Sequence, residues 1–165
     1  MNYMKSKLKL TVKDLKHPVN FFAFGFGSGL YPKAPGTMGT IASIPIYYLL
    51  LTQLSILNYG IFLVATFILG IYICGKSSEL LGVHDHGGIV WDEFVGFWLT
   101  MFMIPVEWYW IILGFILFRI FDILKPWPIS WLDKNCEAGF GIMIDDVLAG
   151  IMASGCLHFI VFVAN

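Results

Sequence analysis

Two pairs of adjacent carboxylates, Asp92-Glu93 and Asp145-Asp146, each stand at the head of an apolar stretch of the sequence. Ionisable groups inside apolar segments are costly to bury and are usually functional. Four carboxylates in one place would repel one another unless a cation lay among them, and oxygen ligands suit Mg²⁺ or Mn²⁺ better than zinc. The alternative is that these acids only complement helix dipoles, which is a surface effect and does not require doubled acids. The pattern favours a metal site with all four residues as ligands.

A glycine follows each acidic pair at helical spacing. Gly96 comes four residues after Asp92, and Gly150 comes four residues after Asp146. Residues four apart lie on the same face of a helix, and small residues allow two helices to approach closely. We therefore expect the two helices to pack together at these glycines and to bring the carboxylates into one site.

His84 and His86 lie in the segment GVHDHGGIVWDE, just before the first acidic pair. Two histidines at this spacing could transfer protons or bind a metal ion. They could equally be loop residues at a membrane interface, and the residues alone leave both interpretations open.

A third group of charged residues occurs in FRIFDILKPWPISW, where Arg119, Asp122 and Lys125 recur every three residues and share one broad helix face. Basic side chains at the end of an apolar helix usually extend towards the membrane surface. Arg119 is the only arginine of the chain and shares its face with an acid, which favours phosphate binding.

The segment FGFGSGLYPKAPGTMGT is rich in glycine and proline and cannot form a regular helix throughout. Glycine lets backbone N–H groups approach an anion closely, so the segment could cradle a substrate with Ser28, Lys33 and Thr37 as donors. Taken by composition alone, it is more simply a loop that leads the chain into the bilayer.

The elements that must position these groups are apolar helices, because 58% of the residues are hydrophobic and the mean hydropathy is +0.79. No charged residue occurs between Lys33 and Lys76. The apolar segments are Met38–Leu51, Leu57–Cys74, Ile89–Ile104, Trp108–Phe121 and Ile144–Ala164. We predict an all-α, polytopic membrane bundle of about four to five apolar helices, although several segments are short for a full span.

The basic residues predict the orientation of this bundle. Under alternation they all fall on one side: Lys5, Lys7, Lys9, Lys13, Lys16, Lys33, Lys76, Arg119, Lys125 and Lys134. That side should be cytoplasmic, and it also collects nearly every acid. We expect residues 1–20 to form a basic interfacial leader and residues 21–165 a single membrane-embedded catalytic domain. With a net charge of −1 and no basic surface, the chain should not bind nucleic acid.

Four strings of the sequence, FGSGLYPKAPGTMG, GVHDHGGIVWDEFVG, FRIFDILKPWPI and GFGIMIDDVLAG, resemble the signature blocks of the phosphatidylglycerophosphatase A family. The resemblance runs in order from about Phe21 to Gly155. It implies a bacterial inner-membrane enzyme that hydrolyses phosphatidylglycerophosphate to phosphatidylglycerol and phosphate and requires Mg²⁺.

The resemblance and the residue chemistry together suggest roles for the candidate residues. The acidic pairs would hold Mg²⁺, and Asp92 and Glu93 would also take part in catalysis. Arg119 and Lys125, with Asp122 on the same face, would bind the phosphate, and Thr37 or Lys33 would close over it.

The attacking group is left open by the sequence: water could attack directly, or a carboxylate such as Asp92 could first accept the phosphoryl group. In either route His84 or His86 is a candidate for proton transfer.

The competing hypothesis is a small cation transporter or a non-catalytic membrane subunit, in which buried carboxylates line an ion path. A transporter needs its acids near the bilayer midplane, whereas these acids lie at helix ends beside glycine-rich loops. The pattern therefore favours the enzyme.

Overall fold

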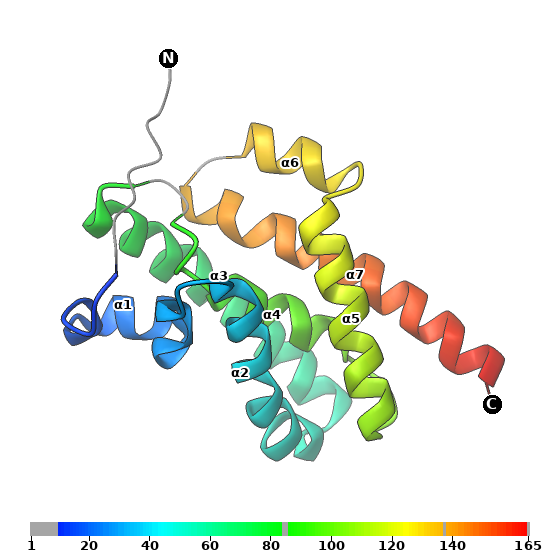
Figure 1. The fold of residues 1–165 in the computed structure, drawn as a ribbon. Coiled ribbons are helices and arrows are strands. Elements are labelled where there is room, and N and C mark those ends of the chain that lie inside the picture. Colours follow the sequence, from blue (N-terminus) through cyan, green and yellow to red (C-terminus); the bar gives the residue numbers. More distant parts are fainter. Residues whose placement is uncertain (1–9, 84–85, 137, 165) are drawn as a thin grey trace.

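The structure, a computed structural model, describes residues 10–83, 86–136 and 138–164, and these residues form helices and no strands. Short 3-10 turns at Asp14–Lys16, Gly25–Leu30 and Leu51–Gln53 accompany the α-helices. The α-helices are α1 (Pro18–Ala23), α2 (Pro35–Leu49), α3 (Ile56–Leu81), α4 (Trp91–Thr100), α5 (Trp108–Leu124), α6 (Ile129–Asn135) and α7 (Ala138–Ala164) (Figure 1). The prediction of an all-α chain is confirmed.

Each of the five predicted apolar segments contains a helix, but fewer of these helices than the predicted four to five are candidate membrane spans. Among the described residues, α3 and α7, with 26 and 27 residues, are the helices long and apolar enough to cross a membrane. The remaining three, α2, α4 and α5, have 15, 10 and 17 residues. At a rise of about 1.5 Å per residue, ten residues cover about 15 Å of a hydrocarbon core near 30 Å thick.

Local sequence explains where the main helices begin and end. Pro35 opens α2 at a position where its missing N–H costs nothing. The hydroxyl of Ser55 caps α3 by accepting a hydrogen bond from the Asn58 N–H at 3.3 Å. Gly82 then ends α3 in the left-handed conformation, with φ of 65°. Two of the helices, α1 and α6, were not predicted, because each is short and lies in a segment rich in turn-forming or aromatic residues.

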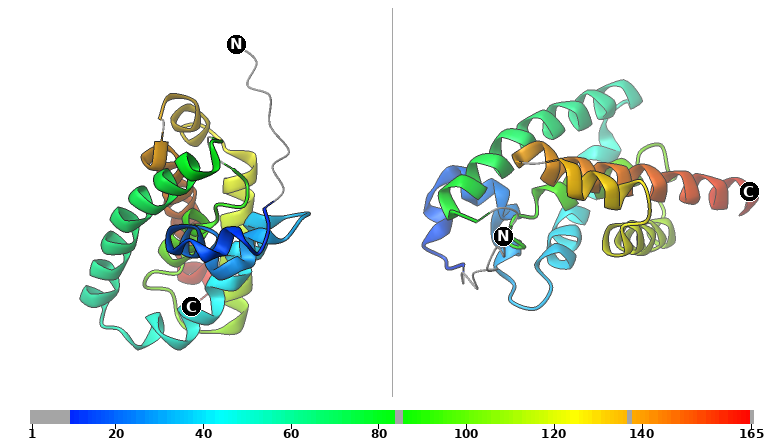
Figure 2. Two further views of the ribbon diagram at one scale, coloured as in Figure 1. Left: turned by 90° about the vertical axis from the view of Figure 1, so that its left-hand side faces the viewer. Right: turned by 90° about the horizontal axis from the view of Figure 1, so that it is seen from above.

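The helix α4 lies at the centre of the bundle and packs against α2, α3, α5 and α7. Its first turn carries Asp92 and Glu93, and most of its residues are buried. Along its length α7 contacts α3, α4, α5 and α6, so it connects the two sides of the bundle (Figures 1 and 2). The acidic residues of α4 and α7 therefore face one another inside the protein.

The close contact between α4 and α7 depends on the two glycines that follow the acidic pairs. A Cβ atom on Gly150 would lie 2.5 Å from the carbonyl oxygen of Gly96. A Cβ atom on Gly96 would lie 2.8 Å from the carbonyl oxygen of Asp146. Both distances are shorter than real Cβ contacts, so only glycine allows this approach. The predicted packing of the two helices at Gly96 and Gly150 is confirmed.

Large apolar side chains are exposed along the outer faces of the long helices. On α3, Ile61, Val64 and Ile68 are about 60% exposed, and on α7 Phe159 and Phe162 are exposed still further. Water would penalise an apolar surface of this extent, whereas lipid would not. These faces support association with a membrane.

We expect Gly150→Ala to destabilise the protein, although alanine usually stabilises a helix relative to glycine. The added methyl group would meet the Gly96 carbonyl, and overpacking of this kind costs about 1 to 3 kcal/mol. Gly155→Ala is the matched control on the same helix, because nothing lies within 4 Å of its Cβ position. Thermal unfolding in detergent should separate the two variants, and equal stability would contradict the close contact.

Candidate active site

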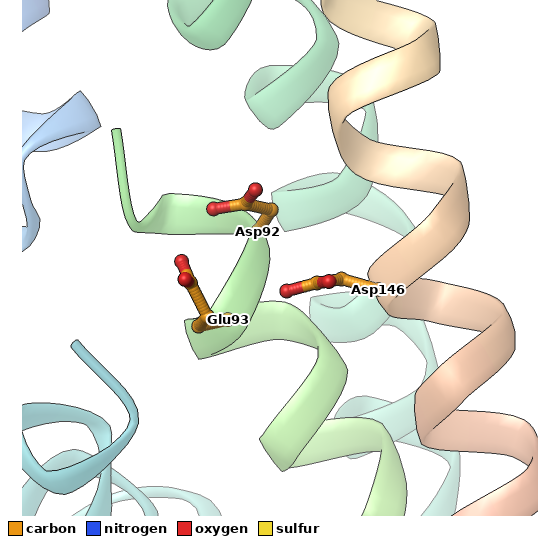
Figure 3. Close-up of side chains that lie close together, drawn as sticks. All are labelled: Asp92, Glu93 and Asp146. Atoms are coloured by element: carbon orange, nitrogen blue, oxygen red, sulfur yellow. The ribbon is translucent and has the colours of Figure 1, made fainter. Parts of the chain in front are cut away.

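The site is built around three carboxylates, Asp92 and Glu93 from the first turn of α4 and Asp146 from α7 (Figure 3). One oxygen from each carboxylate lies within 4.8 Å of the others. Asp92 and Asp146 are only 8% and 4% exposed. Three carboxylates buried at this distance repel one another strongly in the absence of a positive charge.

The chemistry of these side chains fits a hard divalent cation. Glu93 Oε2 and Asp146 Oδ2 are buried and have no hydrogen-bond partner. In an octahedral Mg²⁺ site with Mg²⁺–oxygen distances of about 2.1 Å, neighbouring ligand oxygens are about 3.0 Å apart and opposite ones about 4.2 Å apart, so the three oxygens would approach one another by up to about 2 Å to hold one ion. Burial raises the pKa of Glu93, and the nearby charges of Asp146 and Asp122 raise it further, against the opposing effects of Asp92 and Arg119.

Asp145 does not join this cluster, so the prediction that it binds the metal together with the other three is not supported by the geometry. Its Oδ2 accepts a hydrogen bond from Lys125 Nζ at 2.5 Å, and its Oδ1 accepts one from the Asp146 N–H at 3.1 Å. Asp145 instead lines the cavity next to the cluster.

Lys125 connects three elements at the rim of the site. It ends α5 in the left-handed conformation, with φ of 43°, and Pro126 follows it. Its ammonium group lies 2.5 Å from Asp145 on α7 and 2.5 Å from Asp133 on α6. Burial alone would lower the pKa of Lys125, but the hydrogen bonds to Asp133 and Asp145 outweigh it and raise the pKa, so this side chain stays charged.

Arg119, on α5, lies beside the cluster through its contacts with Asp122 and Glu93. Its Nη1 is 2.6 Å from Asp122 Oδ2 and 3.9 Å from Glu93 Oε1, and the Arg119 and Asp122 side chains are both at least 85% buried. Asp122 is also within hydrogen-bonding reach of Asp146. A Cβ atom on Gly36, in the first turn of α2, would collide with Glu93 and press on Arg119. Glycine at this position lets the start of α2 lie directly against the site.

A cavity of about 420 Å³ opens beside the cluster. The charged residues that line it are six carboxylates and one lysine: Asp92, Glu93, Asp122, Asp133, Asp145, Asp146 and Lys125. Arg119 adds a second positive charge at the edge of the cavity, where it contacts the lining residues Glu93 and Asp122. The described part of the site thus carries more negative than positive groups.

The other predicted site residues lie at different distances from this cavity. Thr37 is half-buried in the first turn of α2, next to Gly36. Lys33 is exposed and does not line the cavity among the described residues. His86 lines a separate cavity of about 390 Å³, which shares Gly87 with the acidic one. His84 lies outside the residues that the structure describes.

Two contributors were not predicted from the sequence, Asp133 and Gly36. Asp133 lies eight residues after Lys125, beyond a turn, so no helical spacing relates them. Gly36 belongs to the glycine-rich segment, where composition alone could not distinguish it from its neighbours. The one available signal was its place directly after Pro35, at the start of a helix.

Comparison with known proteins identifies related chains. Residues 21–161 match the family model of phosphatidylglycerophosphatase A. The chain is 47% identical to the phosphatidylglycerophosphatase A of Escherichia coli (strain K12) over 157 residues, 94% of this chain and 88% of the relative. It is 51% identical to the phosphatidylglycerophosphatase A of Haemophilus influenzae over 141 residues, 85% of this chain and 86% of the relative. No solved structure matches the chain.

The geometry predicts that the neighbouring acids Asp145 and Asp146 differ in their effect on metal binding. Asp146→Asn removes charge from the three-carboxylate cluster, so the affinity for Mn²⁺, used as a spectroscopic substitute for Mg²⁺, should fall at least tenfold. Asp145→Asn chiefly weakens the contact with Lys125 and should lower this affinity far less. Titration by electron paramagnetic resonance in detergent measures both. Equal losses would mean that Asp145 is a ligand after all.

Proposed function

The chain belongs to the phosphatidylglycerophosphatase A family, and we propose that it hydrolyses phosphatidylglycerophosphate to phosphatidylglycerol and phosphate at the acidic cavity, with Mg²⁺ as cofactor. The observation that carries the proposal is the buried cluster of Asp92, Glu93 and Asp146. A small cluster of carboxylates on rigid helices is a common way to hold the cation that phosphoryl transfer requires.

The excess of negative charge makes a cation necessary for this activity. A phosphomonoester carries about −1.5 to −2 charges at pH 7, and six carboxylates line the cavity that must receive it. Without a cation, the substrate would be repelled. We propose that Asp92, Glu93 and Asp146 hold Mg²⁺, which would offset charge on the phosphoryl oxygens and lower the pKa of a bound water.

Arg119 and Lys125 are the basic residues proposed to contact the phosphate. Arg119 offers a planar fork of donors, and its Nε has no hydrogen-bond partner. Asp122 holds the guanidinium in place at 2.6 Å. We therefore reassign Asp122 from substrate binding to the positioning of Arg119, because a carboxylate would repel a phosphate.

The first turn of α2 is proposed to cover the phosphate from the side of Arg119. Gly36 already lies against Glu93 and Arg119, and Thr37 follows it with a half-buried side chain. The free N–H groups of a helix N-terminus favour anions. Lys33 is more remote, and His86 lies in the adjacent cavity, so we propose no direct contact of either with the phosphate.

We propose that the site lies at the cytoplasmic side of a bacterial inner membrane that the chain crosses more than once. The segment that follows Asp146 in α7, residues 147–164, carries no charged side chain. Its eighteen residues span about 27 Å, close to the thickness of the hydrocarbon core. Asp146 would thus lie near the level of the lipid headgroups, on the side where the Lys and Arg residues collect.

Phosphate release from phosphatidylglycerophosphate by purified protein in detergent should stop in excess chelator and return with Mg²⁺, but not with zinc alone. Asp92→Asn and Asp146→Asn should each lower kcat by at least 10²-fold while the protein remains folded in the membrane. Glu107→Gln is the control, because Glu107 is exposed at the start of α5 and does not line the cavity. Full activity in chelator would refute the metal site.

Arg119→Lys tests the planar fork without removing the positive charge. If Arg119 holds two phosphate oxygens at once, lysine should lower kcat/KM by on the order of 10²-fold. Lys76→Arg is a suitable control for a basic exchange, since Lys76 pairs with Glu79 on an exposed part of α3. Kinetics of Arg119→Lys close to those of the unmodified protein would remove Arg119 from the phosphate site.

A further inference from the structure

A shallow apolar groove of about 360 Å³ runs along the outer face of α5 and is lined by Phe115, Ile116, Arg119, Ile120, Ile123 and Leu124. These residues are spaced at i, i+1, i+4, i+5, i+8 and i+9, so they form one strip of the helix surface. Ile116 and Ile120 are 45% and 44% exposed, whereas Ile123 and Leu124 are 67% and 72% exposed. Exposure therefore rises toward the C-terminal end of the strip.

Arg119 joins this groove to the acidic cavity. Its aliphatic stem contributes to the groove, while its guanidinium points inward to Asp122 and lies 3.9 Å from Glu93. Glu93 in turn belongs to the three-carboxylate cluster. A molecule lying in the groove would thus have its apolar part on the isoleucines and its polar part within reach of a buried positive charge.

We propose that this groove binds an acyl chain of the lipid substrate and so directs the phosphate-bearing headgroup over Arg119 into the acidic cavity. The inference rests on the proposed lipid phosphatase function. From Phe115 to Leu124 the helix rises about 14 Å, which is close to half the thickness of the hydrocarbon core. The strip therefore covers about the depth of one leaflet, with the stem of Arg119 near its middle.

A larger apolar groove on α3 does not have these properties. It has a volume of about 680 Å³ and is lined only by apolar side chains and Gly60, including Ile61, Val64 and Ile68. No charged or polar side chain among its lining residues could receive a headgroup. The α3 groove therefore resembles any lipid-facing surface, and a substitution in it serves as the control for substitutions in the α5 groove.

The test compares long-chain phosphatidylglycerophosphate in mixed micelles with a dihexanoyl analogue that is soluble as a monomer. Ile120→Trp and Ile116→Trp fill the groove on α5, and Ile61→Trp adds the same bulk to the groove on α3. We expect each α5 variant to lose at least tenfold more kcat/KM on the long-chain lipid than on the short-chain analogue. The α3 variant should show no such difference between the two substrates.

The outcomes separate the inference from the function on which it rests. If the unmodified protein hydrolyses neither substrate, the proposed function fails. If it hydrolyses both, but the α5 variants lose activity equally on both, tryptophan has displaced Arg119 and the groove does not select an acyl chain. The inference would also be overturned if Ile61→Trp lost as much more kcat/KM on the long-chain lipid than on the short-chain analogue as the α5 variants do. Any bulky residue facing lipid would then cause the loss.

A second measurement does not depend on the activity of the tryptophan variants. Phosphatidylglycerophosphate with a photoreactive diazirine in one acyl chain is irradiated with the Asp146→Asn protein, and labelled peptides are identified by mass spectrometry. Labelling should concentrate on residues 115–124 and should fall when unlabelled substrate is added in excess. Labelling spread evenly over α3, α5 and α7, or insensitive to competition, would contradict a specific chain-binding groove.

Discussion

The mutual repulsion of carboxylates buried around one cavity is the constraint on which the other features of this structure depend. Asp92, Glu93 and Asp146 lie within 4.8 Å of one another, and three further acids line the same cavity. Such an arrangement costs several kcal/mol unless positive charge compensates it. It therefore explains why Arg119 and Lys125, two basic residues of the described part of the site, both form ion pairs with carboxylates around the cavity.

The fold brings these charges together through helix contacts that have little to do with charge. Gly96 and Gly150 let α4 and α7 touch backbone to backbone, and this contact lies one turn below the acids. In an apolar environment the burial of hydrophobic surface does not drive helix association, so close packing at small residues has to do so. The same contact that holds the bundle together thus also sets the spacing of the carboxylates.

Much of this arrangement could be predicted from local patterns, and the limits of the prediction have physical causes. The glycine four residues after each acid correctly indicated where two helices meet. The structure separates the two acids of the second pair, because Asp145 pairs with Lys125 while Asp146 lies with Asp92 and Glu93. Hydropathy located the five apolar helices but not which of them could cross a membrane, since it does not show whether a segment, such as α4, is shielded by neighbouring helices.

Helical spacing correctly predicted that Arg119 and Asp122, three residues apart, lie on the same helix face, where they form an ion pair. It could not reveal Asp133, which reaches Lys125 only because the chain turns after Pro126. Contacts across a turn depend on its backbone geometry, and here that geometry includes a lysine in the left-handed conformation that no sequence rule would assign to it.

The pairing of Arg119 and Lys125 also shapes how a phosphate can bind. A phosphomonoester brings about two negative charges, so one divalent cation that enters with it only cancels the charge of the substrate. The additional attraction must come from Arg119 and Lys125, which are already engaged by Asp122 and by Asp133 and Asp145. In the proposed reaction the phosphate would therefore share the Arg119 guanidinium and the Lys125 ammonium with these carboxylates.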